Sequence, residues 1–150
     1  MQIRPFHPLD WPQLWSFLEP VFREGTTYVL DQDISEADAK TFWLGGEKKT
    51  FVAEFEGELV GSYMLRPNQT GPGSHVCNCG YVTAQSYRGQ GVASALCDHS
   101  QAQAIDLGYL AMQFNFVVST NEGAIRLWKR HGFEEVGRLP KAFQHPKNGL

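Results

Sequence analysis

The spacing of apolar residues divides the chain into helical and extended segments. Apolar side chains recur every three to four positions from Asp10 to about Phe22, which predicts an amphipathic helix with Pro12 in its first turn. A second helix is expected from Asp33 to about Gly46. The two helices are joined by a polar, glycine-containing loop.

Runs rich in β-branched and aromatic residues predict the strands. The expected strands are Gln2–Pro5, Thr50–Phe55, Glu58–Leu65, His75–Thr83, Ala111–Val118 and Phe133–Gly137. One further helix should run from Gly91 to Gly108, and another should be capped by Asn121 and end at Gly132. This order predicts an α/β (α+β) fold whose mixed sheet is antiparallel first and parallel later.

A glycine loop separates a strand from a helix within Gly80–Leu96. Gly89 and Gly91 lack Cβ atoms, so a ligand can approach backbone N–H groups that the start of a helix leaves unpaired. The helix dipole and the charge of Arg88 both favour an anion there, and a phosphate is the expected ligand. A Walker loop is excluded because valine follows Gly91, and Ser94 replaces the third glycine of a dinucleotide fingerprint.

Composition and charge narrow the class of protein. A chain of 150 residues that is 42% hydrophobic is expected to form one domain, residues 1–150, rather than a disordered chain. The net charge of −3 argues against nucleic acid or an anionic membrane as the main partner. No apolar leader and no long apolar run is present, so a cytoplasmic protein is expected.

The cysteines are expected to be free core thiols. Cys77 and Cys79 lie too close on one strand to form an unstrained disulfide. Together with His75 they project from one face of that strand, which is poor geometry for tetrahedral zinc. We therefore expect no metal site.

Two segments resemble the GNAT superfamily of N-acetyltransferases. The loop Arg88–Ala93, RGQGVA, resembles the signature R/Q-x-x-G-x-G/A, which holds the pyrophosphate of acetyl-CoA in that superfamily. About thirty residues downstream, Asn121–Phe133 resembles the segment N-x-x-A-x-x-L-Y-x-K-x-G-F. Their order and separation make the pair far more specific than either alone, and the resemblance covers nearly the whole chain.

The resemblance implies a V-shaped mixed sheet of six to seven strands flanked by about four helices. It implies acetyl-CoA as co-substrate, with pantetheine in the opening of the sheet, and a tendency to form homodimers. The residues expected to bind the cofactor are Val82, Thr83, Arg88, Gly89, Gln90, Gly91, Val92, Ala93, Asn121 and Trp128.

A narrower likeness, over the last two-thirds of the chain, is to the azetidine-2-carboxylate (proline-analogue) acetyltransferases. It implies that Asn78 and Asn115 serve substrate binding and chemistry, although each could equally be a satisfied structural amide. Tyr28 and Glu24 belong to the predicted acceptor loop; both are candidates for substrate contact, and Glu24 is also a candidate base acting through water. A solvated carboxylate and ordinary packing are the alternative interpretations.

One position departs from the superfamily pattern. Trp128 stands where GNAT proteins often carry the tyrosine that protonates the leaving thiolate, and an indole cannot do so at neutral pH. Tyr81 or a bound water is the expected substitute. The backbone near Tyr81 and Val82 is also where the resemblance places the donor to the carbonyl oxygen.

The resulting hypothesis is a direct transfer of the acetyl group from acetyl-CoA to the amine of a small molecule, an amino acid or an analogue. Such a transfer needs no protein nucleophile. Two alternatives stay open: a non-catalytic acyl-CoA-binding module, and an acetyltransferase that acts on a protein N-terminus or lysine.

Overall fold

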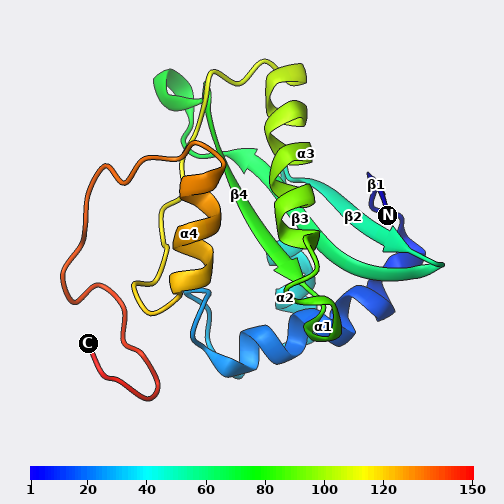
Figure 1. Cartoon of the computed structure of the whole chain (residues 1–150), viewed down its shortest axis with the longest axis horizontal. Coiled ribbons are helices and arrows are strands. Elements are labelled where there is room, and N and C mark those ends of the chain that lie inside the picture. Colours follow the sequence, from blue (N-terminus) through cyan, green and yellow to red (C-terminus); the bar gives the residue numbers. More distant parts are fainter.

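A mixed five-stranded sheet forms the centre of the molecule, and the computed structural model describes all of residues 1–150. The strands are β1 (Gln2–Pro5), β2 (Lys49–Phe55), β3 (Glu58–Pro67), β4 (Val76–Thr83) and β5 (Ala111–Met112). They lie in sequence order across the sheet; β1 to β4 pair antiparallel, and β5 pairs parallel to β4 (Figure 1).

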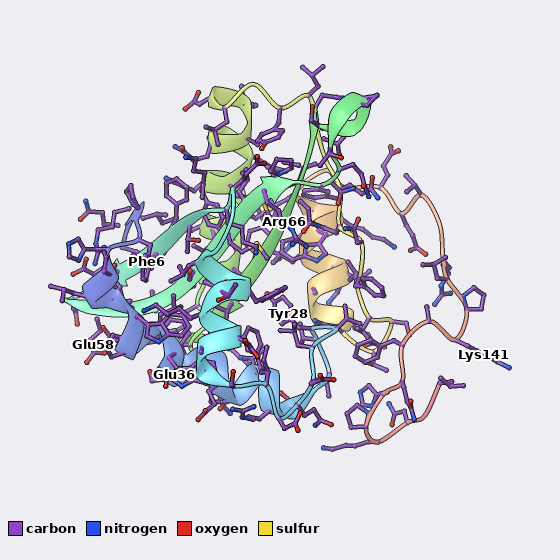
Figure 2. All side chains as sticks on the ribbon, turned by 180° about the vertical axis from the view of Figure 1, so that it is seen from behind. Phe6, Tyr28, Glu36, Glu58, Arg66 and Lys141 are labelled. Atoms are coloured by element: carbon purple, nitrogen blue, oxygen red, sulfur yellow. The ribbon has the colours of Figure 1, made fainter.

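Helices cover both faces of this sheet. The four α-helices are α1 (Trp11–Glu24), α2 (Glu36–Leu44), α3 (Val92–Asp106) and α4 (Glu122–Arg130). Figure 1 shows α3 in front of the sheet and α4 beside β4, whereas α1 and α2 cover the opposite face, which Figure 2 shows from behind. None of the helices has the length and hydropathy required to span a membrane.

Two apolar cores result from this layering. The first joins α1 and α2 to the sheet and contains the fully buried Trp43, whose indole N–H donates to Ser62 Oγ at 3.0 Å. The second joins α3 to the other face and contains Tyr63, Cys77 and Leu96. Alternation along β4, and along β3 beyond the irregularity in its pairing with β2 near Leu59, assigns successive residues to one core or the other.

Local signals explain where the helices begin and end. The buried positions of α1 include Leu14, Phe17, Leu18 and Val21, which lie on one stripe as expected for an amphipathic helix, and Phe22 is buried as well. The helix ends at Gly25, whose φ of 70° is readily adopted by glycine. The side chain of Ser35, and not that of Asp33, caps α2 by accepting from Asp38 N–H at 3.1 Å.

The expected count of six to seven strands is wrong. The predicted strand Phe133–Gly137 has no regular structure, and the predicted strand Ala111–Val118 is reduced to β5. A strand requires a hydrogen-bonding neighbour, and neither segment has one beyond the two residue pairs of β5 with β4. Val136 accordingly is 94% exposed.

Candidate functional site

A cleft of about 980 Å³ lies where β4 and β5 separate. Pairing between these strands ends at Cys77 and Met112, so the remainder of β4 has a free edge on that side. The cleft is walled by the loop after α1, by β3 and β4, by residues 114–118, and by α4. It reaches from the glycine loop at the start of α3 to the far ends of β3 and β4.

The free edge of β4 presents main-chain groups to the cleft. The carbonyl of Cys77 faces β5, because it accepts from Gln113 N–H at 2.8 Å. Alternate residues of a strand direct their N–H and C=O groups to the same side, so those of Tyr81 face the gap as well. The hydroxyl of Tyr28 donates to Tyr81 O, in agreement with this direction.

The glycine loop forms one end of the cleft. Gly89 and Gly91 have φ values of 76° and 83°, and a Cβ at either position would meet no atom within 4 Å. Gly91 is the N-cap of α3 and provides no side chain, so the first N–H groups of α3 are left for a ligand. Arg88 is exposed, forms no ion pair, and lines the cleft beside Gly89.

The opposite wall at this end belongs to α4. Asn121 caps the helix as predicted, since its Oδ1 accepts from Ala124 N–H at 3.3 Å. Trp128 packs with its ring centroid 4.9 Å from that of Tyr81 and 4.7 Å from that of Phe114.

A side-chain contact ties α4 to α3. His131 Nδ1 lies 2.9 Å from Asp98 Oδ1, and His131 Nε2 lies 2.8 Å from Ser94 Oγ. The carbonyl of His131 also accepts from Gln101 Nε2 at 3.1 Å. The three α3 residues therefore set the position of the C-terminal end of α4.

The other end of the cleft contains a network of amides. Asn78 is buried, and its Nδ2 donates to Gln113 O at 2.8 Å. Asn115 is exposed; its Nδ2 donates to Asn68 Oδ1 at 2.7 Å, and its Oδ1 accepts from Gln113 Nε2 at 3.1 Å. Asn78 and Asn115 both line the cleft.

Two candidate residues of the acceptor loop also reach the cleft. Tyr28 packs edge-on against Phe22, Phe42 and Trp43, and burial raises the pKa of its phenol well above the usual range. Glu24, at the end of α1, lines the cleft and is exposed, and its carboxylate forms no ion pair.

The hydroxyl of Tyr81 is engaged away from the cleft. It lies 2.6 Å from Ser100 Oγ of α3 and 3.7 Å from the sulfur of Met112. Burial raises the pKa of this phenol far above its usual range. What Tyr81 directs toward the gap is its main-chain N–H and carbonyl.

The cleft brings together most of the predicted site. The predicted residues that line it are Glu24, Tyr28, Asn78, Tyr81, Val82, Thr83, Arg88, Gly89, Ala93, Asn115, Asn121 and Trp128. Gln90, Gly91 and Val92 do not line it: Val92 is buried under the sheet and Gln90 Nε2 donates to Ser86 O. Sequence reasoning missed Arg66, which lines the cleft next to Asn78; the pairing of the predicted strands was the signal that could have found it.

Comparison with known proteins agrees with this architecture. Residues 11–133 match the model of the acetyltransferase (GNAT) family. The chain is 26% identical over 142 residues to the N-acetyltransferase aca1 of Schizosaccharomyces pombe, covering 84% of this chain and 68% of that protein.

Solved structures give the same result. A GCN5-related N-acetyltransferase from Kribbella flavida superposes with a TM-score of 0.92 at 36% identity, covering 99% of this chain and 90% of that one. A phosphinothricin acetyltransferase from Sinorhizobium meliloti, solved in complex with acetyl-CoA, has the same fold, with a TM-score of 0.85 at 18% identity over 99% of this chain and 82% of that one. Family model, relatives and fold agree: the chain belongs to the GNAT family of acetyltransferases.

Proposed function

We propose that the protein is an acetyl-CoA-dependent N-acetyltransferase that acts on the amine of a small molecule, an amino acid or an analogue of one. The observation that carries the proposal is one continuous cleft, which joins the glycine loop at Gly89 to the amide network at Asn78 across the free edge of β4. Acetyl-CoA bound at one end of the cleft and an amine bound at the other would meet at that edge.

The residues at the loop end fit a coenzyme A phosphate. The open space around Gly89 and Gly91, the unpaired N–H groups of α3 and the charge of Arg88 all favour an anion. Val82 and Thr83 line the path from there to the gap, and Asn121 and Trp128 form its far wall. Bound there, acetyl-CoA supplies an activated acetyl group.

The groups at the gap suit transfer without a protein nucleophile. The main-chain N–H of Tyr81 would donate to the carbonyl oxygen as its negative charge grows. The amide of Asn78 would orient the amine, and Glu24 would accept its proton through water. In this proposal Tyr81 acts through its backbone. The coenzyme A thiolate leaves unprotonated or takes a proton from a bound water.

The charge of the cleft favours a small acceptor over a protein amine. Glu24 is the single carboxylate that lines it, against the cations Arg66, Arg88 and Lys147. A lysine side chain or a protein N-terminus would bring only positive charge to a wall that is already basic, whereas a free amino acid also brings a carboxylate. A non-catalytic acyl-CoA-binding module is the second candidate, and the observation that favours it is the engaged hydroxyl of Tyr81.

The test mixes acetyl-CoA with a panel of amino acids, small amines and peptides and follows the release of free thiol. We expect turnover with small amines and little with peptides. Gly89→Ala should raise the KM for acetyl-CoA at least about tenfold, a loss of roughly 1.4 kcal/mol, because a methyl group then occupies the approach to the loop.

Gly57→Ala is the matched control. Gly57 also has positive φ and open surroundings, but it lies in the β2–β3 hairpin, so it should show the same backbone strain with an unchanged KM. Coenzyme A binding without turnover of any amine would contradict the proposal and favour the binding module.

A further inference from the structure

Arg66 lies at the acceptor end of the cleft on the same face of the sheet as Tyr28. It follows Met64 on β3 by two positions, and Met64 belongs to the core beneath α1 and α2. Figure 2 shows Arg66 and Tyr28 on this face, between α2 and α4. Arg66 is half-buried and lines the cleft.

The guanidinium of Arg66 has no partner in the protein. The arginine side chains that donate hydrogen bonds are those of Arg4 and Arg23, and Arg66 takes part in none of the ion pairs. An arginine that lines the cleft and is paired with no carboxylate of the protein is available to pair with a carboxylate of a ligand.

A second cation lies close to Arg66. Lys48 is half-buried, with Nζ 5.5 Å from the ring centroid of Phe42, another residue of the cleft wall. Burial lowers the pKa of the Lys48 ammonium, and the charge of Arg66 lowers it further. The two like charges repel each other, and neither Lys48 nor Arg66 is paired with a carboxylate, so an anion bound at Arg66 would relieve the repulsion.

The cross-strand neighbour of Arg66 is Asn78. Directly opposed residues of an antiparallel pair have Cβ atoms about 4.5–5.5 Å apart. The amide of Asn78 has a defined direction, because Gln113 O can only accept and therefore faces Nδ2. This leaves Asn78 Oδ1 as a free acceptor on the residue that neighbours Arg66 across the two strands.

From this pairing we infer that Arg66 is the specificity-determining residue of the acceptor site, binding a carboxylate carried next to the reacting amine while Asn78 Oδ1 accepts from the amine. The inference rests on the proposed function and names its substrate class: amino or imino acids with a free carboxylate. A planar guanidinium matches a carboxylate with two parallel hydrogen bonds. The short spacing between the two strand positions suits an amine and a carboxylate on one carbon.

The experiment pairs each α-amino or cyclic imino acid of a panel with its neutral carboxamide and measures kcat/KM for both, together with the KM for acetyl-CoA. Wild type should prefer the acid roughly 10- to 100-fold. Arg66→Gln should reduce the preference to about unity without changing the KM for acetyl-CoA, and Arg66→Lys should restore part of it. Denaturant unfolding of each variant confirms that it folds.

The charge-matched control is Lys49→Gln. Lys49 is exposed at the start of β2 and is paired in register with Leu65, whose side chain belongs to the α3 core. This variant loses the same charge near Arg66 but should keep the preference for acids. If Arg66→Gln also keeps it, or if wild type uses carboxamides equally well, the inference is wrong while the proposed function stands.

If wild type acetylates nothing in the panel, the proposed function fails, and titration calorimetry on the coenzyme A complex decides the inference. The same acids should then bind wild type at least about tenfold more tightly than their carboxamides, and Arg66→Gln should abolish the difference. Equal binding of acid and carboxamide overturns the inference.

Discussion

The two walls of the cleft belong to regions that are held in place differently. Every buried residue lies between Trp11 and Ala104, and residues 105–150 contain none. Most of the large apolar side chains that are exposed, including Val136 and Leu139, lie in that last part. One wall is therefore part of a packed core, and the other rests on individual contacts.

This difference has a physical consequence for the cleft. Segments with few buried apolar contacts open locally at low free energy, whereas core segments open only when the whole protein unfolds. The wall of α4 depends on the ring contacts of Trp128 with Tyr81 and Phe114, and on the contacts of His131 with α3. We expect α4 to move more readily than β4 when a ligand as long as acetyl-CoA enters.

The largest expected difference is in the free energy of unfolding when one or the other of two tryptophans is replaced. Trp43→Ala should lower the free energy of unfolding by about 3–5 kcal/mol, because it removes a fully buried ring from the core. Trp128→Ala should cost only about 1–2 kcal/mol, since this ring is half-buried and contributes mainly ring pairs. Urea unfolding with a common m-value measures both. Equal losses would contradict the comparison.

An intermediate effect is expected at His131. His131→Ala removes the side-chain contacts with Ser94 and Asp98, so amide hydrogen exchange in α4 should accelerate roughly tenfold, or by about 1.4 kcal/mol of local opening. The urea midpoint should hardly change. Arg130→Ala, at the exposed neighbouring position, is the control and should leave the exchange unchanged. A shift of the global midpoint as large as the local effect would mean that α4 belongs to the core.

The smallest effect compares two ion pairs and depends on pH. Hydrogen bonds from Arg4 hold the pKa of Asp10 below its usual value, so the Asp10 carboxylate stabilises the folded state above about pH 4 and loses this contribution as the pH falls through its folded pKa. Asp10→Asn should cost about 1 kcal/mol at pH 7 and progressively less in acid.

The matching change in α4 is Arg126→Ala. Its pair with Glu122, at 3.9 Å, is exposed, so the loss should stay below about 0.5 kcal/mol. Urea unfolding at pH 7 and pH 3 measures both variants. If the loss of unfolding free energy in Asp10→Asn is as large at pH 3 as at pH 7, the loss comes from packing and not from the ion pair.

Short-range signals in the sequence predicted much of the fold and the site. The glycine loop before α3 and the cap of α4 at Asn121 each depend on residues close in the chain, and both form. The neighbourhood of Arg66 and Asn78 depends instead on the register of β3 with β4, which local patterns do not supply. The predicted strand Phe133–Gly137 failed for a related reason, because alternation cannot provide a pairing partner.

Under the proposed function, the bare main chain at Gly89 and the side chain of Arg66 would recognise the two substrates of one cleft in different ways. Peptide N–H groups are common to nearly all residues, so the grip on a phosphate depends on loop shape and tolerates changes elsewhere. In the proposed function, selection among acceptors would rely on side chains such as Arg66, which a single codon change can replace. New acceptor preferences could then evolve in this protein while the residues that would bind acetyl-CoA stay unchanged.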